Sequence, residues 1–453
     1  ILFLASVSRR MVPSTTLTEE TVSVDESPSV SSDRPILASV PLPPNKIRRT
    51  QALWPKLLHA IVLPLLVGLA VFGYEGRLSV ELMQRTWPVM ALLTAAYLGA
   101  WILSSGFERF PFVGRGETAL ASVMMTLVPA GVVLVGLPTS PIQILALTVT
   151  LGSIVWFLLS PLLQRYRRSR LLLLPGGATE EVLGVPGVSL GREDERSGPL
   201  DGIVAHLHAS LSGFKNVLAD QGMKGVPIYH VSYIYELLTA RVFLRDSCDV
   251  SINIQPPRLY PYVKRAMDLV LVLGSLPITG PLMVLAAIAI RLESPGPVLF
   301  WQERVGKGGE PFQMVKFRSM YTGNEGEDRA VFADEEDNRV TTVGKILRKL
   351  RIDELPQFWN VLKGDMSLIG PRPEQAGLVD YFCEEMELYN QRHLVRPGIT
   401  GWAQVHQGYA DDQESTRRKL EYDLYYVKHQ SVIVDLLIIY LTLKTILTGF
   451  GAR

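Results

Sequence analysis

The chain has few cysteines and almost no net charge, and both absences limit its class. Only Cys248 and Cys383 occur, and they form no CxxC motif, so no disulfide framework is expected and the soluble parts are expected to be cytosolic. The formal net charge is +1, which argues against a nucleic-acid partner. The HExxH signature of zinc enzymes and the GxGxxG signature of dinucleotide-binding domains are also missing.

Apolar residues are plentiful instead, and they are clustered. They make up 47% of the chain, and the mean hydropathy is +0.20. Four apolar segments each have about the 20 residues that cross a bilayer: residues 53–74, 87–105, 117–137 and 141–163. Basic residues precede the first segment, separate the second from the third and follow the fourth, which predicts that both ends lie in the cytoplasm. The segments carry no central charge, so a four-helix transmembrane bundle over 51–165 is predicted to be an anchor more than a transport path.

The soluble regions beside this bundle differ in composition. Residues 1–50 are rich in Ser, Thr and Pro and predict a disordered cytosolic tail, and the first residues do not form a complete signal peptide. Residues 166–250 alternate strand-like and helical runs, which predicts a Rossmann-like α/β domain. Its Gly176-Gly177 turn could cradle a phosphate, but a structural or regulatory domain is the favoured interpretation. Residues 251–263 form a proline-rich linker.

A further apolar stretch within residues 264–291 is long enough to span the membrane, but it is interrupted. Pro277 removes a helix hydrogen bond in its middle, and Ser275 is placed to cap the freed backbone groups. Basic residues lie at both ends, which favours a re-entrant helix that enters and leaves on one face. The alternative is an ordinary fifth crossing, which would place everything that follows on the other side of the membrane.

The densest polar signals follow this helix, in residues 264–453. The adjacent acids Asp353 and Glu354 lie among Arg348, Arg351 and Arg372. Acids can hold a divalent metal while arginines hold phosphate oxygens in bidentate fashion, so the pattern suits a phosphate-handling site. On spacing alone, a solvated acid pair on a helix would be the simpler interpretation. The rigid Gly/Pro turns that carry further arginines and acids favour a site. The acidic run at 321–340 lacks ligand spacing and is predicted to be a surface loop.

Several runs in this region resemble the bacterial sugar transferase family, the polyprenyl-phosphate glycosyl-1-phosphate transferases. In chain order they are KR at 264–265 with Asp268, QERVG at 302–306, KFRSM at 316–320, DELPQ at 353–357, NVLKGDMS at 360–367, GPRP at 370–373 and RPGITGW at 396–402. The N-terminal half matches the large membrane-bound members by layout rather than by motif. Two departures, Ser319 and Ile352, remove no group that the family's mechanism needs.

The resemblance implies a reaction and roles for the residues. Asp353 would attack the sugar-linked phosphate of a UDP-sugar, release UMP and pass the phosphosugar to undecaprenyl phosphate, while Glu354 would bind Mg²⁺. The sugar is expected to be glucose or galactose, in the first membrane step of exopolysaccharide, capsule or O-antigen repeat synthesis. The substrate-phosphate ligands implied by the resemblance are Arg348, Arg372, Arg396, Lys316 and Arg318.

The expected architecture is therefore a multi-domain protein of the bacterial inner (cytoplasmic) membrane. It combines the four-helix bundle, the Rossmann-like α/β domain and an α+β catalytic domain on the cytoplasmic face, which contains the re-entrant helix and interfacial amphipathic helices. Residues 431–449 are expected to form one interfacial helix, since they carry Asp435 and Lys444. A homodimer is plausible. The alternatives are a membrane-tethered nucleotide-sugar-modifying enzyme, disfavoured by the missing GxGxxG, and a polysaccharide export scaffold, disfavoured by the dense polar site.

Overall fold

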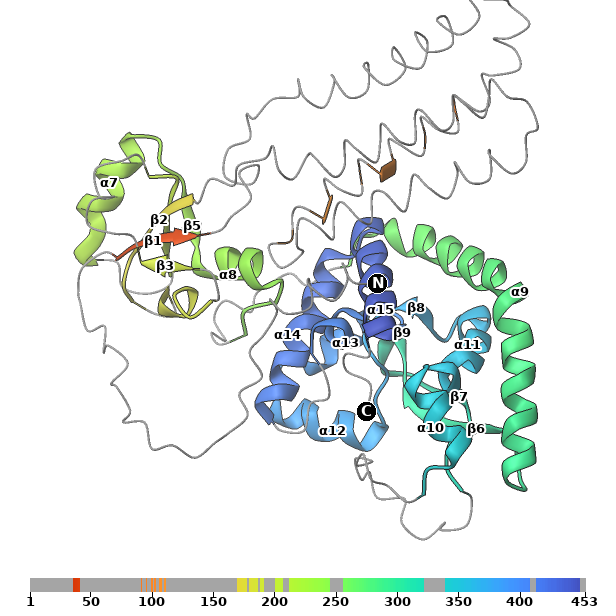
Figure 1. Cartoon of the computed structure of the whole chain (residues 1–453). Helices are drawn as coiled ribbons and strands as arrows, with labels where there is room; N and C mark the ends of the chain where they lie inside the picture. The colour runs from red at the N-terminus through yellow and green to blue at the C-terminus, as the bar shows by residue number, and fades with distance from the viewer. Residues whose placement is uncertain are drawn as a thin grey trace, which may run out of the picture.

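The structure is a computed structural model of the chain, and it describes two folded regions (Figure 1). The described residues are 36–40, isolated positions between 91 and 110, 169–176, 179–185, 188–190, 200–206, 212–244, 256–321, 339–407 and 413–448. The predicted four-helix bundle, most of the N-terminal tail and most of the acidic run lie outside them, so these predictions stay as they were.

The first region is a small α/β domain with a five-stranded sheet. Its elements are β1 (Ile36–Val40), β2 (Ser169–Leu173), η2 (Thr179–Val182), β3 (Ser189–Leu190), β4 (Gly202–Ala205), η4 (Ser212–Phe214), α7 (Lys215–Met223), β5 (Ile228–His230) and α8 (Val231–Thr239). The strand order is β3-β1-β2-β4-β5, and β2, β4 and β5 are parallel. The helices η4 and α7 connect the parallel neighbours β4 and β5, as in a βαβ unit. The predicted α/β arrangement of this region is confirmed.

The prediction that residues 1–50 form a disordered tail is wrong for the strand β1. This strand pairs antiparallel with both β2 and β3, so it lies inside the sheet. Its residues Ala38 and Val40 are fully buried. This five-residue run has four apolar residues within a region of polar composition, and it is stable because two neighbouring strands satisfy its backbone groups.

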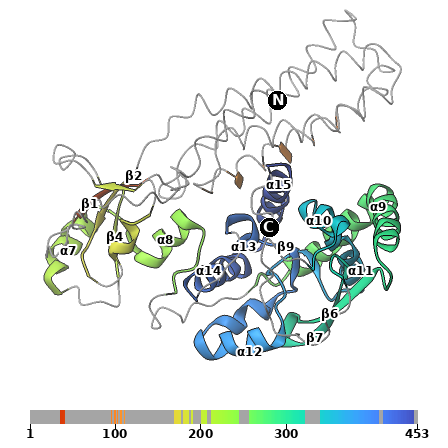
Figure 2. The same cartoon turned by 60° about the horizontal axis from the view of Figure 1, so that its bottom comes forward.

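The second region is an α+β domain that begins with α9 (Tyr260–Glu293). The elements that follow are β6 (Leu299–Val305), η5 (Lys307–Gly309), β7 (Pro311–Phe317), α10 (Thr342–Lys349), η6 (Ile352–Gln357), α11 (Phe358–Lys363), β8 (Ser367–Ile369), α12 (Ala376–Glu385), η7 (Tyr389–Leu394), β9 (Gly398–Thr400), α13 (Trp402–His406), α14 (Gln413–His429) and α15 (Val432–Thr448). The hairpin β6–β7 and the parallel pair β8–β9 are its two small sheets. Figure 2 shows β6 and β7 at one end of this domain, beside α12.

The helix α9 is a single helical element of 34 residues, about 50 Å long, and it bends sharply in Figure 1. Among the described residues it is the one helix long and apolar enough to cross a membrane. Pro277 and Pro281 lie inside it, so two backbone hydrogen bonds are missing where the chain carries them. The Ser275 hydroxyl donates to the Val272 carbonyl (2.9 Å), and the Thr279 hydroxyl donates to the Ser275 carbonyl (3.0 Å). The expected interruption is therefore a bend in a continuous helix, with hydroxyl groups bonded to backbone carbonyls around it.

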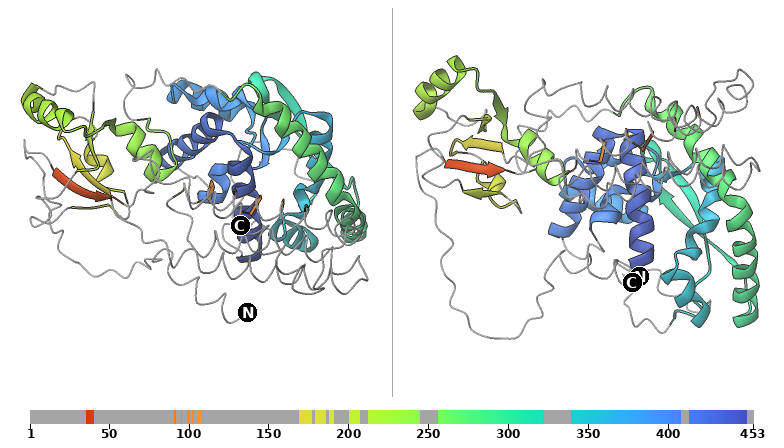
Figure 3. Two further views of the ribbon diagram at one scale, coloured as in Figure 1. Left: turned by 90° about the horizontal axis from the view of Figure 1, so that it is seen from above. Right: turned by 45° about the horizontal axis from the view of Figure 1, so that its top comes forward.

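The two halves of α9 are held to the domain by separate contacts. Lys264, Asp268 and Val272 are buried in the first half, at every fourth position, and Ala286 and Ile290 are buried in the second. The stretch around the prolines contains no buried residue. Figure 3 shows α9 along the side of the domain that faces away from the α/β domain.

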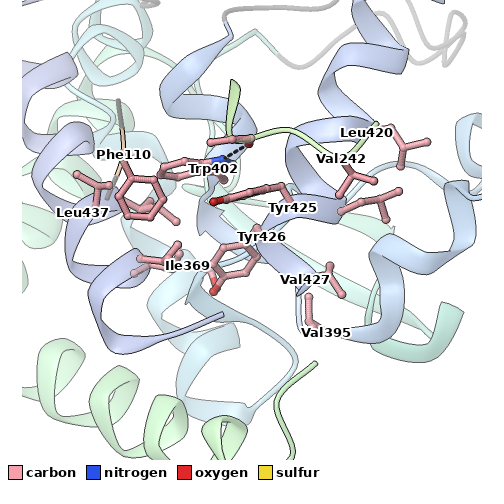
Figure 4. Close-up of a cluster of buried hydrophobic side chains, with 14 of the residues drawn as sticks. Phe110, Val242, Ile369, Val395, Trp402, Leu420, Tyr425, Tyr426, Val427 and Leu437 are labelled. Carbon is pink, nitrogen blue, oxygen red and sulfur yellow. Dashed lines mark hydrogen bonds between the residues drawn. The ribbon is translucent and has the colours of Figure 1, made fainter. Parts of the chain in front are cut away.

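Aromatic side chains form the centre of the second region (Figure 4). Trp402, Tyr425 and Tyr426 are buried there, with the Trp402 and Tyr425 rings stacked at 6.0 Å between centroids. The Trp402 indole N–H donates to the Ala240 carbonyl (3.0 Å), which belongs to the segment leaving α8. The two folded regions are therefore joined at the aromatic core.

The expectation that residues 431–449 form an interfacial helix is wrong for the first half of α15. Val434, Asp435, Leu437 and Ile438 are all buried in that core. Asp435 accepts hydrogen bonds from Lys264 (2.6 Å), Tyr260 (2.6 Å) and Tyr426 (2.8 Å). The charge of Asp435 predicted a solvent-exposed helix face, but the structure buries it in an ion pair with Lys264. This ion pair holds the start of α9 against α15.

We expect Asp435→Asn to destabilise the protein by about 3–5 kcal/mol, because it removes the carboxylate that pairs with the buried Lys264 ammonium at 2.6 Å and leaves Asp268 as its counter-charge. Thermal or denaturant unfolding in detergent measures this change. Tyr260→Phe is the matched control: it removes one hydrogen bond to the same carboxylate and should cost only about 1 kcal/mol. Equal losses for the two variants would contradict a charge-based role.

Candidate active site

The acid pair Asp353-Glu354 lies on the short helix η6, directly after an unusual turn. Arg351 has φ 56° and ψ 22°, in the left-handed region that a non-glycine residue seldom adopts. This turn ends the basic helix α10 and starts η6, so it redirects the chain by one residue's conformation. Glu354 is buried as a result, and η6 packs on the strand β7.

Three cations from three elements surround the Glu354 carboxylate. Arg372 donates from Nη1 (3.1 Å) and Nη2 (3.0 Å), Arg351 Nη1 lies at 3.6 Å, and Lys316 Nζ lies at 3.8 Å. Burial alone would raise the pKa of Glu354, but the charges of these cations outweigh it and lower the pKa to about 2. All of these contacts use Oε1, so Oε2 can face another ligand.

Asp353 has the opposite environment. Burial, together with the negative charge of Glu354, raises its pKa to about 6, although Lys316, Arg348 and Arg351 counteract the shift. Its Oδ1 atom is buried and has no hydrogen-bond partner among the described residues. A buried acceptor without a partner is uncommon in folded proteins, so we expect this oxygen to contact a bound substrate or ion.

Lys316 completes the cation cluster from β7. Burial lowers its pKa to about 8, with Arg372 acting in the same direction. Four cations therefore face two carboxylates, which makes the site a receptor for further negative charge, such as phosphate oxygens.

The structure brings together five of the predicted site residues and gives Arg318 another role. Asp353, Glu354, Lys316, Arg348 and Arg372 interact as one cluster. Arg348 also donates from Nε to the Ser319 hydroxyl (2.9 Å), which fixes it beside the cluster.

Arg318 was predicted to contact phosphate, but the structure commits it to the end of α9. It is buried, and its guanidinium donates to the Ser294 carbonyl (2.8 Å), the Ser294 hydroxyl (2.8 Å) and the Pro295 carbonyl (2.9 Å). Arg396 lies just before β9, and among the described residues it forms no ion pair with either carboxylate. Arg318 follows directly after β7, which ends at Phe317, and its side chain binds the end of α9 instead of joining the cation cluster.

Other motif residues hold the scaffold of the site. The Asn360 side chain bonds to Val315 N–H (3.1 Å) and to the Gln313 carbonyl (2.7 Å), which attaches α11 to β7. Arg265 donates to the carbonyls of Val361 and Leu362 at the end of α11. These contacts hold α11, which follows the acid pair, between the apolar helix α9 and the hairpin β6–β7.

Arg351 was noted as a neighbour in the sequence but not predicted as a site residue. Its position three residues before Glu354 is the helical spacing that brings side chains together, so the spacing contained this signal.

The residues fit a Mg²⁺ ion that shares its coordination with a substrate. Among the described residues no group of three or more acidic, histidine or cysteine side chains could form a complete metal cage. Mg²⁺ is commonly held by one or two carboxylates together with substrate phosphates. The Asp353 Oδ1 atom has no hydrogen-bond partner among the described residues, and the cations bind Glu354 through Oε1, which suits that arrangement.

Comparison with known proteins identifies the family of the chain. The bacterial sugar transferase family matches residues 259–449. A UDP-N-acetylgalactosamine-undecaprenyl-phosphate N-acetylgalactosaminephosphotransferase of Aeromonas hydrophila is 47% identical over 296 residues, which cover 64% of this chain and 70% of the relative.

Two further relatives are UDP-glucose:undecaprenyl-phosphate glucose-1-phosphate transferases. The protein from Caulobacter vibrioides is 46% identical over 191 residues (42% of this chain, 71% of the relative). The protein from Escherichia coli is 43% identical over 182 residues (40% of this chain, 39% of the relative). The chain therefore belongs to the bacterial sugar transferase family and is an enzyme of the glycosyl-1-phosphate transferase class.

Proposed function

We propose that the chain transfers a sugar-1-phosphate from a UDP-sugar to undecaprenyl phosphate through a covalent intermediate on Asp353. The observation that carries the proposal is the contrast within the acid pair. Glu354 is held ionised by three cations, whereas Asp353 keeps one buried oxygen without a partner. Two neighbouring carboxylates in unlike environments suit two different tasks.

The chemistry has two displacements at phosphorus. In the first, an Asp353 oxygen bonds to the sugar-linked phosphorus, and the bond from that phosphorus to the UMP oxygen breaks. In the second, a phosphate oxygen of undecaprenyl phosphate bonds to the same phosphorus, and the bond to Asp353 breaks. Splitting one displacement into two lets a single site serve a soluble donor and a lipid acceptor in turn.

The cations would stabilise charge in both steps. Arg372 can pair with two phosphate oxygens at once, while Lys316 offers a compact charge from β7. Arg348 faces Asp353 and would balance the charge of the attacking group. Arg396, half-buried before β9, stays a proposed phosphate ligand on the resemblance alone.

Glu354, with Asp353 beside it, would hold Mg²⁺. The bound ion would offset the negative charge of the diphosphate.

The position of the site suits an acceptor in the membrane. We propose that α9 is the re-entrant helix of the catalytic domain, which lies on the cytoplasmic face of the inner membrane beyond four transmembrane helices. Large apolar side chains are exposed on α9, including Val270, Ile278 and Leu292, and on β6, α10 and α11 nearby, including Trp301, Ile346 and Trp359. Such exposure is expected of a surface that contacts lipid.

The sugar and the pathway are finer points of the same proposal. Glucose or galactose was expected from the layout of the chain. The relatives are named for UDP-glucose and for UDP-N-acetylgalactosamine, and the Aeromonas match covers 64% of this chain. The donors to test are therefore UDP-glucose, UDP-galactose and UDP-N-acetylgalactosamine, with exopolysaccharide, capsule or O-antigen synthesis as the pathway. A homodimer stays a prediction.

We expect the detergent-solubilised protein to release UMP from at least one of these donors when Mg²⁺ and undecaprenyl phosphate are present. Chelation of Mg²⁺ should lower the rate at least about 100-fold, since the diphosphate charge is then left to the side chains alone, and added Mg²⁺ should restore it. The absence of UMP with every donor, from folded protein, would overturn the transferase proposal.

We expect Asp353→Asn to lower kcat about 10³-fold or more, because it removes the nucleophile. The wild-type protein incubated with donor and Mg²⁺ but no lipid should release about one UMP per chain and carry a phosphosugar on the peptide that contains Asp353, detected by mass spectrometry. Glu354→Gln should lower the rate and weaken the dependence on Mg²⁺.

Asp380→Asn, an exposed change on α12, is the matched control for both variants and should keep wild-type turnover. An Asp353→Asn protein that still forms the adduct would exclude this nucleophile.

We expect a cysteine at Leu292, in a background without Cys248 and Cys383, to react with a membrane-impermeant maleimide only after cells are permeabilised. Leu292 is 81% exposed near the end of α9, so a re-entrant helix returns it to the cytoplasm. Thr139→Cys, in the uncharged turn that the charge pattern places outside, is the control and should react in intact cells. Labelling of position 292 in intact cells would mean that α9 crosses the membrane.

A further inference from the structure

The loop of residues 370–374 carries Arg372 to Glu354, but it has few hydrogen bonds of its own. It reads Gly-Pro-Arg-Pro-Glu and joins β8 to α12. Pro371 and Pro373 have no N–H group, so the loop cannot complete a regular backbone ladder. Its conformation must therefore be fixed by donors from other parts of the chain.

Each of its last four carbonyls has such a donor. Gly398 N–H donates to the Pro371 carbonyl (2.9 Å), and Val305 N–H donates to the Glu374 carbonyl (2.9 Å). The two central carbonyls are bound by arginine side chains. Arg304 Nη1 donates to Pro373 (3.3 Å), and Arg392 Nη2 donates to Arg372 itself (2.8 Å).

Arg392 is well suited to fix a backbone position. It lies on η7, is 2% exposed, and shares its guanidinium with Asp423 of α14. Asp423 Oδ2 accepts from Nε (3.2 Å) and Nη2 (2.8 Å), and the Tyr389 hydroxyl accepts from Nη1 (3.1 Å). A buried charge is retained only with such pairing, so the guanidinium has one orientation.

We propose that Arg392, oriented by Asp423, is a positioning residue for Arg372. It binds the carbonyl of the residue whose side chain reaches Glu354, and so sets where the Arg372 guanidinium meets phosphate. This inference rests on the proposed function for its effect on turnover. Arg392 touches neither carboxylate of the acid pair among the described contacts; it acts through the loop.

Lysine cannot replace arginine in this position. The planar guanidinium donates to Asp423, Tyr389 and the Arg372 carbonyl in fixed directions, whereas a lysine ammonium is one compact group on a flexible stem. Arg392→Lys therefore keeps the positive charge that Asp423 needs but loses the fixed link to the loop.

The kinetic test is a double-mutant cycle in the full-length protein with UDP-sugar, Mg²⁺ and undecaprenyl phosphate. We expect Arg392→Lys to lower kcat/KM for the UDP-sugar about 10- to 100-fold, as a misplaced catalytic group does. In the Arg372→Ala background the same change should have little further effect, because the side chain to be positioned is gone. Losses that multiply in the double variant, or an Arg392→Lys protein within about twofold of wild type, would overturn the proposal.

Tyr389→Phe is a milder second variant, which tests the same contact if Arg392→Lys does not fold. It keeps the Arg392–Asp423 pair and removes one acceptor, so a smaller loss is expected, again absent in the Arg372→Ala background. Arg418→Gln is the matched control. It breaks the Arg418–Glu414 ion pair (3.9 Å), which lies on the same helix as Asp423 and has no described contact with the loop, and its effect should multiply with that of Arg372→Ala.

A second measurement does not depend on turnover. Amide hydrogen exchange of the peptide containing Gly370, Arg372 and Glu374 should be faster in Arg392→Lys than in wild type and unchanged in Arg418→Gln. Unchanged exchange in Arg392→Lys overturns the positioning role even if the transferase proposal holds. Faster exchange in a protein whose wild type releases no UMP would support the positioning role and overturn the proposed function alone.

Discussion

The buried charge of Glu354 is the constraint around which the catalytic domain is arranged. A carboxylate that is 6% exposed must be matched by cations, or it would take up a proton or unfold the site. The matching cations come from β7, from the turn before η6 and from the loop after β8. These elements can meet only if the hairpin, the acid-bearing turn and the proline-rich loop are all in place. Satisfying one buried charge therefore assembles the groups that a diphosphate requires.

A second buried carboxylate, that of Asp435, fixes the position of the apolar helix α9 in the same way. Helix α9 has an exposed apolar surface and two internal prolines, so it needs specific contacts to stay in one position on the domain. The buried Asp435 provides them, because it binds both Tyr260 and Lys264 at the start of α9. Asp268 adds a second attachment by accepting from the Ser367 hydroxyl and Leu368 N–H (both 3.1 Å) on β8. The strand that leads to Arg372 and the apolar helix α9 are thus held by a shared set of buried polar contacts.

Sequence reasoning found the parts of this arrangement whose signals are local. The acid pair, the parallel strands of the α/β domain and the proline-bearing helix each depend on neighbouring residues, and the structure contains them. It missed β1, because four apolar residues are a weak signal inside a polar tail. It also misplaced Arg318 and Asp435, whose partners are 24 and 171 residues away in the chain. A charge is read as exposed when its partner is distant, so buried pairs are the features that spacing cannot reveal. Arg392 and Asp423, 31 residues apart, escaped notice for the same reason.

The α/β domain has no described contact with the acid pair, yet a continuous chain of contacts leads from it to Arg372. The Glu236 carboxylate pairs with Lys428, and the Arg241 guanidinium lies 3.3 Å from Glu421, both on α14. Between them Ala240 adopts φ 51° and receives the hydrogen bond of Trp402. Trp402 follows β9, which pairs with β8, and β8 ends at the loop that presents Arg372. A shift of the segment after α8 would have to move Trp402 or break its hydrogen bond, and the packed aromatic core transmits strain more readily than it absorbs it. The position of the Arg372 side chain is therefore tied to how the α/β domain is seated on the catalytic domain.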